Sequence, residues 1–291
     1  MTLRIAHLSD IHFGGENTAA VGAAFDLLTA DPPDLTVLSG DLTLAGRRAE
    51  FDAARDWVEG LTGHGVRLLA LPGNHDTPEL NLPIRLFAPW RRWRRRLGRS
   101  DGASLSTARW TAVGFNTARG VQIRLNWSKG AVAPRQVSRA VRQLGEAAPG
   151  AVRIVACHHP LVELPHGPMT GDVRGGAHAA RRLAEAGADA VLTGHVHAPF
   201  MMTLPFGDGQ TQAIGAGTLS VRERGAPAGF NMIEIDDLEI RATALAWNGH
   251  AMAPWTRWTA PRRRRSDPRP AAAHQVHDQR DQEQHHEDVE Q

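Results

Sequence analysis

The chain has 291 residues, of which 42% are hydrophobic, so it can build the core of one large globular domain or of two smaller ones. Its 33 basic and 31 acidic residues nearly balance, so net charge identifies no partner, and its single cysteine, Cys157, excludes an internal disulfide. No apolar run approaches the roughly 18 residues of a membrane-spanning helix, and the N-terminal MTLRIAHLSD lacks the apolar stretch of a signal peptide, so we expect a cytoplasmic protein.

Short apolar runs bounded by Gly, Pro, Asn or Asp predict buried strands at residues 3–8, 35–38, 66–71, 111–115, 152–156 and 190–192. Segments with helical spacing lie between them, at residues 51–61, 137–144 and 177–186. This alternation predicts an α/β fold. Between residues 201 and 247 the pattern changes to shorter pieces at 211–216, 230–235 and 240–246, which predict an antiparallel continuation of the sheet.

Polar side chains follow five of the predicted strands. They are Asp10 and His12, then Gly40-Asp41, then Gly73-Asn74-His75-Asp76, then His158-His159, and finally Gly194-His195-Val196-His197. The carboxyl ends of parallel strands converge on one crevice, so these residues are expected to meet there. Carboxylate, imidazole and amide groups are typical ligands of Mn, Fe or Zn, whereas the lone Cys157 fits the strand core better.

Spacing refines this expectation for some of the residues. Asp10 and His12 stand at i and i+2, which in an extended segment places both side chains on one face. His195 and His197 repeat the arrangement, and Gly194 before them allows close backbone approach. Alternation also lets only one of His158 and His159 face the crevice easily, and we favour His158. The Gly-Asp pair at 40–41 is by itself more typical of a turn.

The order Asp-x-His, Gly-Asp, Gly-Asn-His-Asp, His and Gly-His-x-His resembles the calcineurin-like metallophosphoesterases over roughly residues 3–250. The resemblance implies a four-layer α/β/β/α sandwich of two mixed β-sheets flanked by helices. It also implies two divalent or trivalent metal ions. One would be held by Asp10, His12, Asp41 and His197, and the other by Asp41, Asn74, His158 and His195, with Asp41 bridging. The stretches SGDLTLAG and PGNHD are more similar to the cyclic-nucleotide phosphodiesterase-like branch (class III) than to the protein phosphatases.

The implied activity is hydrolysis of a phosphodiester, with a small nucleotide or cyclic nucleotide as substrate. Two metals about 3.5–4 Å apart would activate a bridging hydroxide and stabilise the attacking and leaving oxygens. His75 is not among the implied ligands, so it is the candidate general acid, and we place Asp76 with it in the catalytic loop. Many relatives have an Asp three residues after the bridging carboxylate that orients this histidine. Here that position is Leu44.

Other substrates and roles stay open. The enzyme could act on nucleic acid or a phospholipid head group, and the chain could instead be a non-catalytic metal-binding interaction module. The stretch FAPWRRWRRRLGR at residues 87–99 has six Arg and two Trp. It could form a lid over an anionic substrate, a surface for nucleic acid or an anionic membrane, or a solvated helix face packed by its Trp residues.

The domain organisation follows from these patterns. We expect a metallophosphoesterase domain at residues 1–260 that includes an Arg/Trp-rich insert at about 78–103. Residues 261–291 have arginines at positions 262–265 near their start and lack an apolar pattern, so we expect a disordered polar tail there. The sequence does not predict an oligomeric state.

Overall fold

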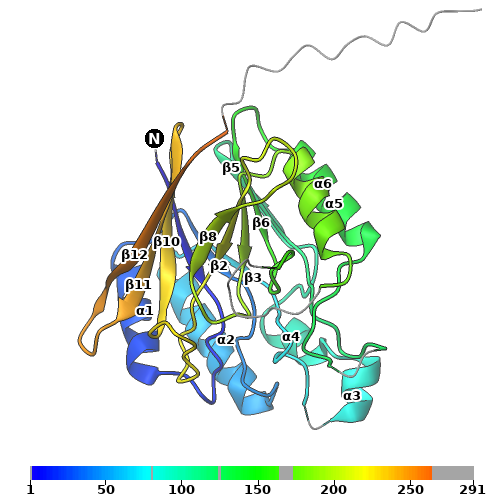
Figure 1. The fold of residues 1–291 in the computed structure, drawn as a ribbon. Helices are drawn as coiled ribbons and strands as arrows, with labels where there is room; N and C mark the ends of the chain where they lie inside the picture. Colours follow the sequence, from blue (N-terminus) through cyan, green and yellow to red (C-terminus); the bar gives the residue numbers. More distant parts are fainter. Residues whose placement is uncertain (1, 80, 124–125, 164–172, 264–291) are drawn as a thin grey trace, which may run out of the picture.

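Two six-stranded sheets face each other in the computed structural model, which describes residues 2–79, 81–123, 126–163 and 173–263 (Figure 1). The first sheet has the order β12 (Met252–Pro261), β11 (Glu239–Trp247), β10 (Gly229–Ile235), β1 (Leu3–Leu8), β2 (Leu35–Leu38) and β3 (Leu68–Ala70). The second has the order β4 (Ser104–Ser106), β5 (Trp110–Gly114), β6 (Val152–Ala156), β7 (Ala190–Thr193), β9 (Gln212–Gly215) and β8 (Phe200–Thr203). Both contain parallel and antiparallel pairs. The expected sandwich of two mixed sheets is confirmed.

Six helices lie outside the sheets among the described residues. They are α1 (Thr18–Ala30), α2 (Arg48–Gly63), α3 (Leu82–Phe87), α4 (Arg91–Arg96), α5 (Pro134–Gly145) and α6 (Gly176–Glu185). Figure 1 shows α5 and α6 side by side against the second sheet, with α1 and α2 on the side of the first. None of these helices is both long and apolar enough to cross a membrane.

Alternation along the strands builds three hydrophobic layers. Ile5 and Ile154 point between the sheets into a shared core. The next residue along β1, Ala6, packs in the core that contains α1 and α2, and Val155 packs in the core that contains α5 and α6. Because successive side chains point to opposite faces, strands buried on both faces must be apolar throughout. This explains why β1 and β6 are mainly apolar, with Arg4, His7 and Arg153 as their polar residues.

The end of the chain's strand pattern differs from the expectation. The predicted strand at 211–216 is β9, which pairs parallel with β7 and antiparallel with β8. The strands predicted at 230–235 and 240–246 are β10 and β11, which pair antiparallel in the other sheet beside β1. The expected antiparallel pairing is thus confirmed for these strands, but the expectation that they continue one sheet was wrong. Apolar pattern identifies a strand, but it does not identify the sheet to which the strand belongs.

The ordered domain extends past the predicted boundary at residue 260. Strand β12 ends at Pro261, and the side chain of Arg262 is buried. Its guanidinium donates to the carbonyl oxygens of Asp236 and Gly150, which belong to opposite sides of the sandwich. Arg262 therefore links segments of the two sheets by hydrogen bonds and belongs to the folded domain. The remaining predicted tail, 264–291, lies outside the described residues.

The Arg-rich insert contains two short helices, α3 and α4. Trp93 is fully buried and meets Phe51 of α2 edge to face, with ring centroids 6.4 Å apart. Arg96 donates to Asp52 of α2 at 2.6 Å. Helix α4 is thus held against α2 by one tryptophan, in agreement with the interpretation of a helix face packed by its Trp residues.

Replacing Trp93 with Ala is expected to lower the free energy of unfolding by about 3–5 kcal/mol, because it leaves a large cavity between α2 and α4. Urea unfolding followed by circular dichroism measures the change. Trp255 is 46% exposed, so Trp255→Ala is the matched control and should change stability by less than about 0.5 kcal/mol. Equal losses in the two variants would contradict the anchoring role of Trp93.

Candidate metal centre

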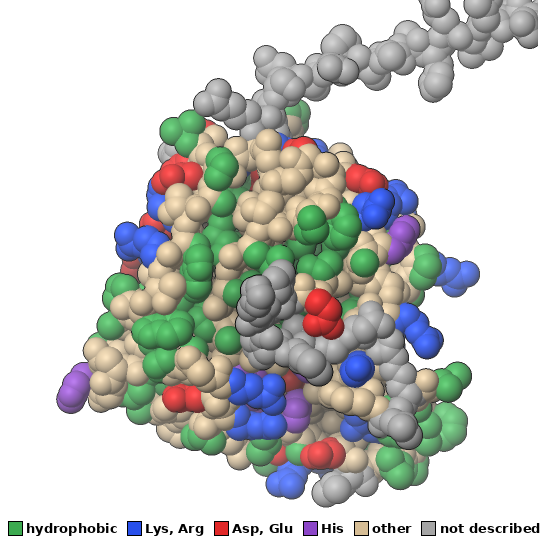
Figure 2. Space-filling model, in the orientation of Figure 1, with side chains coloured by type: hydrophobic (Ala, Val, Ile, Leu, Met, Phe, Trp, Pro, Cys, Tyr) green, Lys and Arg blue, Asp and Glu red, His purple; other side chains and the backbone are tan. Residues whose placement is uncertain are grey.

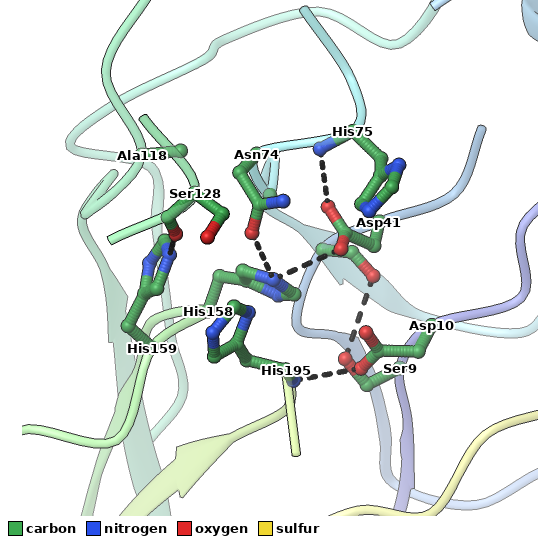
Figure 3. Close-up of polar contacts among 12 residues, drawn as sticks. Ser9, Asp10, Asp41, Asn74, His75, Ala118, Ser128, His158, His159 and His195 are labelled. Atoms are coloured by element: carbon green, nitrogen blue, oxygen red, sulfur yellow. Dashed lines mark hydrogen bonds and ion pairs between the residues drawn. The ribbon is translucent and has the colours of Figure 1, made fainter. Parts of the chain in front are cut away.

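Five loops at strand ends meet at one place between the two sheets. Asp10 and His12 follow β1, Asp41 follows β2, and Asn74 and His75 follow β3 in the first sheet. His158 follows β6, and His195 and His197 follow β7 in the second sheet. The loops are tied together directly, since Asp10 N–H donates to Gly40 O at 2.9 Å and His195 N–H donates to Asp10 Oδ2 at 2.9 Å (Figure 3). The structure therefore brings all seven predicted ligands together, at strand ends of two sheets instead of one.

The first group of ligand atoms belongs to Asp10, His12 and His197. Nε2 of His12 and Nε2 of His197 lie 3.3 Å apart, and Asp10 Oδ1 lies 3.1 Å from the His197 nitrogen. The other ring nitrogens of these histidines are within hydrogen-bond distance of main-chain carbonyls, at Thr43 and Arg222 respectively. A carbonyl only accepts, so each Nδ1 carries the proton and each Nε2 presents a lone pair. Two lone pairs and a carboxylate oxygen thus converge on one point.

The second group is centred on His158. Its Nδ1 lies 2.9 Å from the Ser39 carbonyl, which fixes the ring so that Nε2 faces the site. That Nε2 lies 3.2 Å from Asp41 Oδ2 and 3.2 Å from Asn74 Oδ1 (Figure 3). The ring of His195 is next to it, with centroids 5.2 Å apart. Asp10, Asp41 and His158 also bring their ligand atoms within 4.8 Å of one another, so the two groups adjoin.

Burial and charge show that this place attracts cations. Burial lowers the pKa of His12 and of His195 to about 4, so both rings are neutral at pH 7. Burial also acts on His158, but the Asp41 carboxylate outweighs it and raises the pKa of His158 to about 9. Burial opposes ionisation of Asp41 as well, yet the neighbouring imidazoles hold its pKa well below the usual range. Without metal, a proton on His158 therefore supplies part of the positive charge that the site requires. The residues present fit metal ions.

The backbone is strained where the ligands stand. Asp10, His12, Asp41, His195 and His197 have φ angles of 55°, 53°, 52°, 71° and 59°, and they are the non-glycine residues of the described chain with positive φ. Such conformations cost of the order of 1–3 kcal/mol each and gather at functional sites. The expectation that Asp10 and His12 share a face because their segment is extended was therefore wrong in its reason. Both side chains enter the site from left-handed positions.

Two glycines are required by space rather than by backbone freedom. A Cβ on Gly194 would overlap Ser9 Oγ and Asp10 Oδ2, which agrees with the expected close approach. A Cβ on Gly73 would overlap the carboxylate of Asp41. Gly73 does not have a positive φ, so its role is to make room for Asp41 and not to permit a special turn.

The ring of His75 is oriented by the main chain. Its Nδ1 lies 2.6 Å from the carbonyl oxygen of Leu44, at the position where many relatives have an Asp side chain. Its main-chain N–H donates to Asp41 Oδ1 at 2.8 Å, and its ring meets that of His12 edge to face at 4.8 Å. The side chain of Leu44 cannot orient the His75 ring, but the main-chain carbonyl of Leu44 does so.

Asp76 holds the surrounding loops together. Its buried carboxylate accepts from Gly73 N–H, Leu42 N–H, Thr43 N–H and the Thr43 hydroxyl, at 2.8–3.3 Å. Burial and the Asp41 charge raise the pKa of Asp76 to about 7, although these donors favour the charged form. Because its oxygens are occupied in this way, Asp76 positions the catalytic loop. A catalytic role for Asp76 beside His75 stays a prediction.

His159 lies beside the site, but its ring nitrogens are engaged elsewhere. Nδ1 is 2.8 Å from the Thr117 hydroxyl and Nε2 is 2.7 Å from the Ser128 carbonyl. Its ring centroid is 4.5 Å from that of His195, so it supports this ligand from behind. The structure therefore places His158, and not His159, against Asp41 and Asn74.

Some features of the site had no signal in the sequence. The carbonyls of Ser39 and Arg222 orient His158 and His197, but a carbonyl is common to every residue. Burial opposes a charge on His197, but the Asp10 carboxylate outweighs it and raises the pKa of His197, while the exposed Arg224 acts against this rise and adds positive charge near the site. Figure 2 shows Lys and Arg side chains next to a histidine near the lower centre of one face. A single Arg in a Gly-rich turn is too common to be predicted as functional.

A two-sheet sandwich with adjoining Asp and His groups at its strand ends defines the class of metallophosphoesterases. The family model described as calcineurin-like phosphoesterase matches residues 3–199, so the chain belongs to the calcineurin-like phosphoesterase family. The expected family is thereby confirmed.

Known proteins resemble the chain to different extents. A probable cyclic nucleotide phosphodiesterase of Synechococcus sp. is 41% identical over 88 residues, which are 27% of this chain and 33% of that protein. The match thus spans about a third of the length of this curated relative. A dimetal phosphatase from Danio rerio superposes with a TM-score of 0.63 at 13% identity, covering 88% of this chain and 98% of that one. A purple acid phosphatase from yellow lupin (Lupinus luteus) seeds has a TM-score of 0.58 at 12% identity, covering 89% and 53%. At these identities the two structures support the fold alone.

Proposed function

We propose that this chain is a dinuclear metal-dependent phosphoesterase that hydrolyses a phosphodiester bond of a small nucleotide, with a cyclic nucleotide as the preferred substrate. The observation that carries this proposal is the convergence of imidazole lone pairs and carboxylate oxygens in two adjoining buried groups. Nitrogen and oxygen atoms gathered in this way can serve together as the ligands of metal ions. Main-chain carbonyls hold the rings in this arrangement, so it is built into the fold.

The ligands divide between two ions. Asp10, His12, Asp41 and His197 would hold one metal, and Asp41, Asn74, His158 and His195 would hold the other. Their mixed oxygen and nitrogen donors suit Mn, Fe or Zn. When bound, the metals supply positive charge for the phosphate and lower the pKa of water to near 7. Asp10 and Asp41 only partly offset that charge, which leaves the site attractive to a phosphodiester anion.

His75 would donate the proton that the leaving oxygen needs. Its Nδ1–H is directed at the Leu44 carbonyl, so Nε2 is the atom available for proton transfer. Arg224, beside His197, would attract the substrate phosphate to the opposite side of the site. Asp76 would keep the loop of Asn74 and His75 in register with Asp41.

A small nucleotide is supported by two observations. The stretches SGDLTLAG and PGNHD resemble the cyclic-nucleotide phosphodiesterase-like branch. The Synechococcus relative, whose name refers to cyclic nucleotides, is similar over 88 residues. Both observations concern part of the chain, so the substrate is tested directly.

The test uses full-length protein freed of metal and then supplied with Mn, Fe, Zn or Co. Bis(p-nitrophenyl) phosphate reports phosphodiester hydrolysis, and at least one metal is expected to restore turnover. Failure with all four would refute the enzyme and favour a metal-binding interaction module. A panel then compares kcat/KM for cyclic nucleotides, oligonucleotides and glycerophosphodiesters. A higher value for either of the last two classes would replace the nucleotide with nucleic acid or a lipid head group.

A further inference from the structure

A second site lies outside the metal centre, between helices α2 and α4. It is a pocket of about 280 Å³ whose lining consists mainly of arginine side chains. The lining includes Arg48, Phe51, Arg91, Arg92, Arg95 and Arg96. None of them belongs to the proposed ligand set. The buried Trp93 anchors α4 by packing against Phe51, which itself lines the pocket.

The positive charge of this pocket is not balanced by the protein. Arg96 pairs with Asp52 at 2.6 Å, and Arg92 donates to the main-chain carbonyl of Gly46. Within the part of the chain that the structure describes, Arg48, Arg91 and Arg95 form no ion pair. Five guanidinium groups therefore share one carboxylate partner, which leaves an excess of positive charge around a defined cavity.

This arrangement does not stabilise α4 itself. Arg91 and Arg95 stand at i and i+4, as do Arg92 and Arg96, so like charges are stacked along a helix of six residues. Burial of Arg92 lowers its pKa, and the charge of Arg48 lowers it further against the opposing charge of Glu50. A bound anion would relieve all of these repulsions at once.

We propose that this pocket binds the phosphate chain of a small soluble ligand, either inorganic pyrophosphate or a nucleoside diphosphate. The guanidinium fork matches two phosphate oxygens at a time, so several arginines around one cavity suit adjacent phosphate groups. The excess charge calls for a ligand with more than one negative charge. A volume of about 280 Å³ lies at the lower end of small-molecule sites, which are about 300–1,000 Å³, and fits such a chain.

The experiment substitutes arginines that have no other structural partner. Arg92 also holds Gly46, so the pocket variant is Arg91→Ala with Arg95→Ala. The control is Arg94→Ala with Arg99→Ala, which removes the same charge from exposed positions of the same insert outside the pocket lining. Calorimetric titration of metal-loaded protein with sodium pyrophosphate at about 0.15 M salt measures binding. The pocket variant should lose affinity on the order of 10- to 100-fold, and the control less than about twofold.

Other outcomes would overturn the proposal. Equal losses in the two double variants would show diffuse attraction, and binding of oligonucleotides or anionic vesicles without pyrophosphate would show an extended surface. Asp41→Asn is expected to retain pyrophosphate binding. Loss of binding in Asp41→Asn, with none in the pocket variant, would place the ligand at the metal centre. A methylene-bridged nucleoside diphosphate distinguishes the two proposed ligands. If it binds more tightly than pyrophosphate, the ligand is a nucleoside diphosphate. If it binds equally or more weakly, the ligand is inorganic pyrophosphate.

Discussion

Replacing Asp41 with Asn is expected to lower phosphodiester hydrolysis by about 10³-fold or more and to remove bound metal. The carboxylate is the group that both proposed ions share, and a metal supplies several kcal/mol of transition-state stabilisation, at about 1.4 kcal/mol per factor of ten. Removing one negative charge from a buried site also increases the repulsion between two cations. Metal content by mass spectrometry and turnover of bis(p-nitrophenyl) phosphate measure the two effects.

The fold should survive this substitution. Asn has nearly the same shape as Asp and can keep the acceptor for His75 N–H, which Asp41 Oδ1 now provides at 2.8 Å. Asp26→Asn, at an exposed position on α1, is the matched control and should retain both metal and activity. If the Asp41→Asn protein kept its full metal content and turnover, the bridging role of Asp41 would be excluded.

Replacing His75 with Ala is expected to leave the metal content unchanged and to slow turnover by about 10²–10⁴-fold, the usual scale of general acid-base catalysis. The metal should remain because His75 reaches Asp41 through its main-chain N–H, which Ala also has. Only the ring, oriented by the Leu44 carbonyl, is lost. Turnover and metal content are measured on the same preparations.

The leaving group makes this prediction specific. A p-nitrophenolate departs without help from an acid, so its hydrolysis should suffer less than that of a cyclic nucleotide, whose leaving oxygen is a poor one. His64→Ala is the control, because His64 is exposed at the end of α2, where its ring contacts Gly60 O and Phe25 and none of the proposed ligands. Equal activity of wild type and His75→Ala on the poor leaving group would disprove the assignment of His75 as the general acid.

Much of the candidate site could be predicted because its chemistry resides in side chains. A single Asp or His is ordinary at a strand end, but five such strand ends in one chain indicate a shared site. The strands β1, β2 and β6 were predicted at their observed bounds, since strands buried on both faces are mainly apolar. The expected sandwich also agrees with the structure, although it was implied by the family resemblance and not by the pattern of apolar residues.

Other features depended on partners far away in sequence. The residue pattern of β9 does not show in which direction its neighbour runs. Its parallel pairing with β7 is seen only in the folded chain. Arg262 looks like the start of a polar tail until Gly150 and Asp236 are placed around it. The run of arginines in α4 is typical of a solvated helix face. In the structure the buried Trp93 packs α4 against α2, and arginines of both helices line a pocket.

The sequence by itself determined which ligands this protein can offer and at which strand ends they stand, because residue type and local hydrophobic pattern carry that information. Only the tertiary structure decided how the ligands are aimed. The left-handed backbone at Asp10 and His12 directs their side chains into the site. The carbonyls of Ser39 and Leu44 orient the rings of His158 and His75. Every residue has the same carbonyl group, so its effect depends on the position that the folded chain gives it and not on the identity of the side chain.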